Sequence, residues 1–231
     1  MPDVPSPRAF VTATGTDAGK TFLTAALVRH WRRRGLEPLA LKPVQSGFSE
    51  AEAAGSDAGQ LLAAMGRPLS DLDRIAPWRL AAPLSPDQAA AREGLTLDLD
   101  AVAGFCRRAI AGAVGPVLVE GVGGVMVPLN ARATVLDWMA ALDLPALLVA
   151  GNYLGTLSHT LTALLALEAR GVRVAAVVVN DHRPGPVAVA ETVASLGRHW
   201  PGPILPMPRA PESLDGLCER ISAALTSGQR G

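Results

Sequence analysis

Residues 15–21 carry the clearest chemical signal in this chain, and their sequence is Gly-Thr-Asp-Ala-Gly-Lys-Thr. They follow an apolar run over residues 9–13 and precede a helical pattern, so they form a glycine-bearing turn between a strand and a helix. The backbone N–H groups of such a turn and of the helix N-terminus bind phosphate oxygens. Lys20 is expected to reach the β- and γ-phosphates, and the Thr21 hydroxyl to bind Mg²⁺. The sequence therefore predicts a site for a nucleoside triphosphate.

The spacing of this loop is irregular. A regular phosphate loop would have its first glycine at position 14, which is Thr14 here, whereas the glycine of this chain is Gly15. The alternative is a purely structural turn, which the position between an N-terminal strand and a helix disfavours. We expect the nucleotide to be contacted by Gly15, Thr16, Asp17, Ala18, Gly19, Lys20 and Thr21.

Charged side chains accompany other strands of the pattern. Lys42 lies near the end of an apolar run over residues 39–44, where it could neutralise charge on a transferred phosphoryl group or remain a surface lysine. Glu120 ends another apolar run, where phosphate-loop proteins place an acid that binds Mg²⁺ or orients water. A buried carboxylate without a partner is costly, so a metal or a cation is expected beside it. Asp57 starts a helix, where an N-cap is the alternative role.

Two further segments could bind parts of a nucleotide or a carboxylate. Asn180 closes a long apolar strand, and its amide could read the edge of adenine, although an Asn-Asp turn is the alternative. Pro206, Met207 and Pro208 follow the last strand and could form a wall of the adenine pocket or a plain loop. Residues 151–159 precede a helix whose free N–H groups could bind a carboxylate, unless they form only a glycine-rich turn.

The elements that would position these residues alternate between strand and helix. The fold class is therefore α/β, with a doubly wound, mostly parallel sheet and helices on both faces, like phosphate-loop NTPases. Ligands of such sheets bind at the carboxyl ends of the strands, where the polar clusters of this chain fall. Residues 77–86 are expected to be irregular. Strands are expected at residues 8–14, 39–44, 116–120, 145–150, 172–180 and 203–206, and helices at 20–34, 56–65, 99–113, 134–142, 156–170, 187–199 and 212–225.

Composition narrows the class of protein. The 231 residues suit one domain over 1–231, with the first 7–8 residues loose, and 49% hydrophobic residues with 4% aromatics predict a core of Ala, Leu and Val. The formal net charge is zero, so the composition does not indicate a nucleic-acid-binding protein. Cys106 and Cys218 lie too far apart for a zinc or redox motif. No apolar run reaches membrane-spanning length and no signal peptide is present, so we expect a cytoplasmic enzyme without membrane contact.

Taken together, these segments resemble the dethiobiotin synthetase family. The matching segments occur in the same order over about residues 9 to 210. Taken one by one, only the phosphate loop is specific, whereas the ordered set of segments is highly specific for the family. Four positions depart from the usual pattern, namely Ala13, Asp17, Asp87 and Tyr153, and none of them removes a lysine or a proposed metal ligand. The segments that carry the resemblance are residues 14–21, 42–47, 57, 82–86, 120–124, 154–159 and 180–181.

This resemblance implies an ATP-dependent closure of the ureido ring of dethiobiotin from 7,8-diaminononanoate and CO₂. It implies that Lys20 and Lys42 supply positive charge, and that Thr16 and Ser46 orient the reacting groups. It also implies a Mg²⁺ site made by Thr21, Asp57 and Glu120, and a homodimer whose partner subunit holds the substrate carboxylate near residues 154–158. The substrate-binding residues implied are Thr16, Lys42, Ser46, Gly123, Leu154, Gly155 and Ser158.

Other functions fit the sequence less well. A partitioning or septum-positioning switch ATPase would carry an additional lysine where this chain has Gly15, and a basic amphipathic membrane tail that it lacks. An amidating synthetase of the cobyrinate type would need a glutaminase domain, for which the chain is too short. A regulator that has lost its chemistry would not be expected to retain Lys20, Lys42, Asp57 and Glu120.

Overall fold

A six-stranded parallel sheet forms the centre of the molecule, with the strand order β2-β5-β1-β6-β7-β8. The computed structural model describes residues 6–181, 185, 187–208 and 214–227, so most of the expected loose N-terminal segment lies outside the described residues. The predicted α/β fold with a mostly parallel sheet is confirmed. The strands are β1 (Arg8–Ala13), β2 (Leu39–Leu41), β5 (Val117–Glu120), β6 (Ala146–Gly151), β7 (Val174–Asn180) and β8 (Ile204–Met207).

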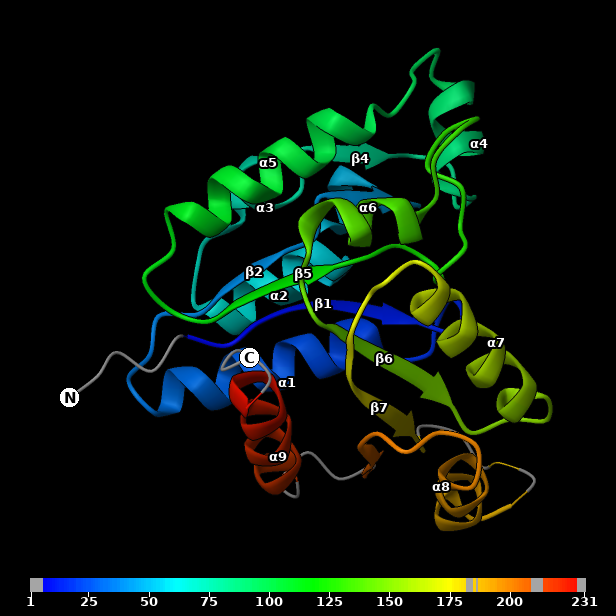
Figure 1. Ribbon diagram of the computed structural model, residues 1–231. Coiled ribbons are helices and arrows are strands. Elements are labelled where there is room, and N and C mark those ends of the chain that lie inside the picture. The colour runs from blue at the N-terminus through cyan, green and yellow to red at the C-terminus, as the bar shows by residue number, and fades with distance from the viewer. Residues whose placement is uncertain (1–5, 182–184, 186, 209–213, 228–231) are drawn as a thin grey trace.

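Helices cover both faces of this sheet, which is why its strands are continuous apolar runs rather than alternating ones. In Figure 1, α1 and α9 lie on one side of the strands and α5 and α6 on the other. The chain adds two short 3-10 helices at Glu50–Gly55 and Leu69–Asp71. The helices are α1 (Lys20–Arg33), α2 (Asp57–Met65), α3 (Leu72–Ile75), α4 (Pro86–Arg92), α5 (Leu99–Ala111), α6 (Val135–Leu142), α7 (Thr156–Ala169), α8 (Val189–Gly197) and α9 (Leu214–Ser227).

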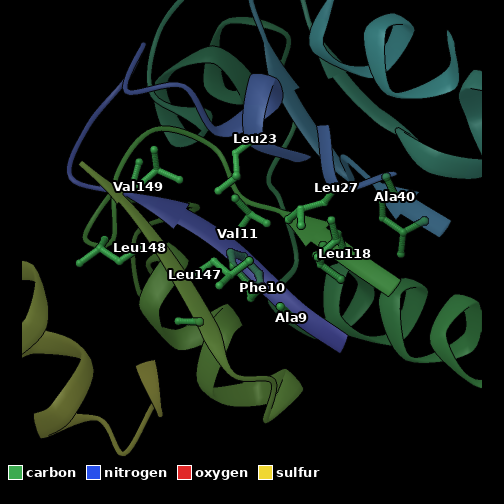
Figure 2. Packing of buried hydrophobic residues seen from close by; sticks show 14 of the residues in the cluster. Ala9, Phe10, Val11, Leu23, Leu27, Ala40, Leu118, Leu147, Leu148 and Val149 are labelled. Carbon is green, nitrogen blue, oxygen red and sulfur yellow. The ribbon is translucent and has the colours of Figure 1, made fainter. Parts of the chain in front are cut away.

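The core lies on both faces of β1. Phe10 packs edge-to-face against Trp138 of α6, with ring centroids 4.9 Å apart. The next residue, Val11, points to the opposite face, where Figure 2 shows it beside Leu23 and Leu27 of α1. These contacts fix β1 between two helix layers, so the loop after β1 leaves the sheet at a defined place.

The region between β2 and α5 differs from the sequence-based expectation. The expected strand over residues 39–44 ends at Leu41, because Pro43 has no N–H group with which to continue the ladder. The chain then forms β3 (Val44–Ser46), which pairs in parallel with β4 (Trp78–Leu80) in a separate two-stranded sheet. The prediction that residues 77–86 are irregular was therefore wrong for β4 and for Pro86, which starts α4.

Smaller differences occur near the C-terminal end. Pro206 lies in the predicted last strand, and Met207, expected to follow that strand, is the last residue of β8 and pairs with Asn180 of β7. The expected last helix over residues 212–225 is α9, although residues 212 and 213 lie outside the described part of the chain. No helix within the described residues is long and apolar enough to cross a membrane.

Candidate functional site

The loop between β1 and α1 lies at the carboxyl end of the central sheet. Gly19 adopts a left-handed backbone with φ of 105° and stands directly before α1, whose N-terminus has no side-chain cap. Free N–H groups at a helix N-terminus are suited to bind phosphate oxygens. A Cβ at Gly19 would lie 2.2 Å from Nδ2 of Asn180, so only glycine allows the loop to approach β7 this closely. The loop geometry is that of an anion site.

The side chain of Lys20 contacts the backbone of this loop and of residue 123. Its side chain is buried, and Nζ donates to the backbone oxygen of Gly123 at 2.8 Å and to that of Gly15 at 3.3 Å. Burial, and secondarily the nearby Lys42 ammonium, lower the pKa of Lys20 from 10.5 to about 8. An anion bound in the loop would offset this penalty, which makes Lys20 a cation poised for phosphate.

An ion cluster that is buried at Lys42 and Glu120 joins four elements beside the loop. Lys42 Nζ lies 2.8 Å from Oε1 of Glu120 and 3.0 Å from Oδ2 of Asp57. Lys42 also donates to the backbone oxygen of Gly121, and Thr21 donates its hydroxyl hydrogen to Oε1 of Glu120 at 2.7 Å. Residues from the end of β2, the start of α1, the start of α2 and the end of β5 therefore meet in one cluster.

The charges in this cluster stabilise one another. Burial alone would lower the pKa of Lys42, but Glu120 and then Asp57 outweigh that penalty and raise the pKa above its usual value. Burial likewise opposes ionisation of Asp57, yet the Lys42 ammonium and its hydrogen bond to Asp57 hold the pKa of Asp57 below its usual value. Lys42 is therefore a fixed cation at neutral pH, held by two carboxylates.

The donor set fits a divalent cation with oxygen ligands. Oε2 of Glu120 is buried and has no hydrogen-bond partner among the described residues, which leaves a carboxylate oxygen available to a metal. Thr21 and Asp57 supply further oxygens nearby, and Mg²⁺ prefers one or two carboxylates together with phosphate and water oxygens. Within the described residues, no group of three or more His, Cys, Asp and Glu side chains gathers around one point, so phosphate oxygens would have to complete the coordination.

A cavity of about 610 Å³ connects the loop with the ion cluster. It brings together nine of the predicted site residues, and it leaves Gly15, Ala18 and the fully buried Glu120 outside its lining. Gln45 also lines the cavity. It lies in the segment between Lys42 and Ser46, both of which were predicted as site residues, but no role was predicted for Gln45 itself. The lining consists of Thr16, Asp17, Gly19, Lys20, Thr21, Phe22, Lys42, Gln45, Ser46, Asp57, Pro83, Leu84, Ser85, Pro86, Val122, Gly123 and Val127.

Asn180 ties the end of β7 to the loop. Its buried Nδ2 donates to the backbone oxygen of Ala18 at 2.8 Å. Met207 of β8 is fully buried, and its Cε would lie 3.4 Å from a Cβ at Gly19. Pro206 is exposed and Pro208 is half-buried. The residues predicted for adenine thus lie at or near the loop, and Asn180 also has a structural role in holding it.

The residues predicted for the substrate carboxylate line a different cavity. Leu154, Gly155 and Ser158 border a mostly apolar hollow of about 700 Å³ between the starts of α7 and α8. Gly155 precedes α7, which has no side-chain cap, and the Leu154 side chain is 89% exposed. Tyr153 and His159 are joined here by a hydrogen bond of 2.8 Å. Within one chain this cavity shares no lining residue with the loop cavity.

Comparison with known sequences identifies similar proteins. A family model described as an AAA domain matches residues 8–207. The ATP-dependent dethiobiotin synthetase BioD of Acidiphilium cryptum (strain JF-5) is 53% identical over 193 residues, which cover 82% of this chain and 86% of the relative. The protein of the same name from Caulobacter sp. (strain K31) is 48% identical over 229 residues, covering 97% of this chain and 98% of the relative.

Solved structures share the fold at low sequence identity. A ParA family ATPase from Chlorobium tepidum TLS superposes with a TM-score of 0.54 at 14% identity, covering 99% of this chain and 94% of that one. The septum site-determining protein MinD from Pyrococcus horikoshii OT3, solved with Mg-ADP, gives 0.53 at 15% identity, covering 96% of each chain. These likenesses show a phosphate-loop NTPase fold and do not by themselves favour a switch function.

Proposed function

Because this chain belongs to the family of ATP-dependent dethiobiotin synthetases and is an ATP-dependent ligase, we propose that its loop cavity binds Mg-ATP together with 7,8-diaminononanoate and CO₂. The observation that carries this proposal is the contact of Lys42 with both Glu120 and Asp57, directly beside the phosphate loop. A cation fixed at this place serves a reaction in which an anionic oxygen attacks a phosphate.

The proposed reaction has three steps. The nitrogen of one neutral amine forms a bond to the carbon of CO₂ and loses a proton to solvent, which gives a carbamate. One carbamate oxygen then forms a bond to the γ-phosphorus of ATP, while the bond from that phosphorus to the bridging oxygen breaks and ADP leaves with the electron pair. The second amine attacks the carbonyl carbon of this carbamic-phosphoric anhydride, closes the ureido ring and expels phosphate. Positioning and charge stabilisation carry most of such a reaction.

The position of each residue in or beside the cavity indicates its role in the reaction. The free N–H groups of the loop and the ammonium of Lys20 bind the β- and γ-phosphates. Lys42, held by its two carboxylates, reduces the repulsion between the carbamate and the γ-phosphate. Thr16 and Ser46 line the same cavity and orient the reacting groups. The buried Oγ of Ser46 has no partner within the described part of the chain, so it is available to a substrate.

Thr21, Asp57 and Glu120 would hold Mg²⁺, with the unpartnered Oε2 of Glu120 as the first ligand. When bound, the metal would neutralise charge on the phosphate oxygens. Thr21 and Glu120 are already joined by a hydrogen bond, and Asp57 is brought near them by Lys42. The chain therefore presents these oxygens in one place before any ligand binds.

We also propose that two copies of this chain form a homodimer in which one copy supplies the carboxylate site of the other. The support is that Leu154, Gly155 and Ser158 lie in a separate cavity with exposed apolar side chains around it. Free N–H groups at the start of α7 suit a carboxylate. A reaction that consumes ATP fits the cytoplasm.

A direct experiment tests the assignment of the reaction. Purified protein is mixed with Mg-ATP, bicarbonate and the diamine, and phosphate and dethiobiotin are measured together. The Lys42→Ala variant should form dethiobiotin about 10²- to 10³-fold more slowly while still binding ATP, because Lys42 lies beside the loop rather than in it. Turnover at the wild-type rate in this variant would refute the role given to Lys42.

A further inference from the structure

Gln45 of β3 has a defined orientation inside the loop cavity. Its side chain is 5% exposed, and Oε1 accepts a hydrogen bond of 3.0 Å from the backbone N–H of Ala58, one residue after Asp57. A backbone N–H group can only donate, so the amide oxygen must face α2 and Nε2 must point away from Ala58. The orientation of this amide is therefore set by chemistry.

The Nε2 group of Gln45 makes no hydrogen bond to any of the described residues. Nε2 is not one of the fully buried polar atoms that lack a partner, so it is a donor that water or a ligand can reach. Gln45 lines the cavity of about 610 Å³. The adjacent Ser46 lines the same cavity and has a buried hydroxyl without a partner among the described residues. Two neighbouring residues of the cavity lining therefore carry polar groups available to a ligand.

Gln45 and Ser46 come from a different element than the phosphate loop. Gly19, Lys20 and Thr21 belong to the loop and the start of α1, whereas Gln45 and Ser46 lie on β3 of the separate two-stranded sheet. The free diamine offers no oxygen acceptor near its amines. After uptake of CO₂ it carries two carbamate oxygens, of which only one attacks the phosphate.

We propose that Gln45 is a positioning residue whose Nε2–H donates to the non-attacking oxygen of the carbamate. This inference rests on the proposed function. Because Oε1 is anchored to Ala58, the amide holds the carbamate at a fixed distance from the start of α2 and from Lys42. The Nε2–H group can donate to a carbamate oxygen but finds no such acceptor on the free diamine, so it favours binding of the carbamylated substrate. Because the amide is neutral, it adds no charge to the cluster of Lys42, Asp57 and Glu120.

The substitution Gln45→Glu tests the donor and the neutrality of this side chain together. It keeps an oxygen for the Ala58 N–H group and replaces Nε2 with a second oxygen that repels the carbamate. We expect kcat/KM for the diamine to fall about 10- to 100-fold, as for loss of a hydrogen bond to a charged group. The apparent KM for bicarbonate should rise, while the KM for ATP should stay near its wild-type value, which also shows that the variant is folded. Gln45→Met, which also removes the anchor, should lose both activity and thermal stability.

Gln60→Glu provides the matched control, because it makes the same change in α2 at an exposed position outside the cavity lining. Its kinetics should equal those of the wild type. Wild-type kinetics of Gln45→Glu would overturn the role of Gln45, and so would a rise confined to the KM for ATP. Absence of dethiobiotin from the wild-type reaction would overturn the proposed function and this inference together, so the two failures are distinguishable.

Discussion

Nucleotide binding is predicted to take up a proton on Lys20. In the free protein, burial and the charge of Lys42 lower the pKa of Lys20 to about 8. Phosphates bound in the loop place negative charge against this ammonium and favour its protonated form. Burial disfavours the charged form of Lys20 and lowers its pKa, whereas a bound anion favours the charged form and raises the pKa again. Binding at a pH near or above 8 must therefore draw a proton from the buffer.

The size of the uptake follows from the pKa. With a free-state pKa of about 8 and full protonation when ATP is bound, the uptake is about 0.1 proton per site at pH 7, about 0.5 at pH 8 and about 0.9 at pH 9. The same linkage makes the apparent Kd for Mg-ATP about tenfold larger at pH 9 than at pH 7. Both quantities follow from one titrating group.

Calorimetric titration of Mg-ATP in buffers of different ionisation enthalpy measures this uptake directly. Lys20→Arg is the control, because arginine keeps its charge throughout this pH range and should abolish the pH-dependent part. An uptake that does not change between pH 7 and 9, or that persists unchanged in Lys20→Arg, would refute the reasoning.

Two further substitutions test the packing of the site. Lys42→Ala should lower turnover by about 10²- to 10³-fold, measured as phosphate release, and should cost about 3 kcal/mol of unfolding free energy in urea because Glu120 loses its buried cation. Normal stability would show that Glu120 does not need this partner. Gly19→Ala should lose at least about 2 kcal/mol and weaken ATP binding, because its φ is positive and its Cβ would strike Asn180. The control Gly216→Ala has open space in α9 and should gain about 0.5–1 kcal/mol, and equal melting temperatures for the two variants would contradict the close approach.

Sequence patterns were sufficient for the main sheet because its strands are apolar runs separated by helices of several turns. Two of these strands, Val174–Asn180 and Ala146–Gly151, are buried along almost their whole length, so their sequences are continuous apolar runs that predict a strand. The strands β3 and β4 span three residues each, too few to show a period, and their pairing depends on contacts across the chain. The break at Pro43 was also missed, although proline itself was the available signal.

The convergence of the site was predictable for a topological reason. Lys20, Lys42 and Glu120 follow parallel strands, whose carboxyl ends meet at one edge. The orientation of Gln45 was not predictable, because it depends on the backbone of Ala58 in another element. The separation of Leu154 from the loop cavity likewise depends on how α7 and α8 meet.

The most direct test of the central claim is the product analysis of one reaction. The protein is incubated with Mg-ATP, ¹³C-bicarbonate and 7,8-diaminononanoate, and products are identified by mass spectrometry alongside phosphate release. We predict dethiobiotin carrying one ¹³C atom and one phosphate per ring closed, both dependent on the diamine. Phosphate released at the same rate without the diamine, and with no labelled dethiobiotin, would contradict the account.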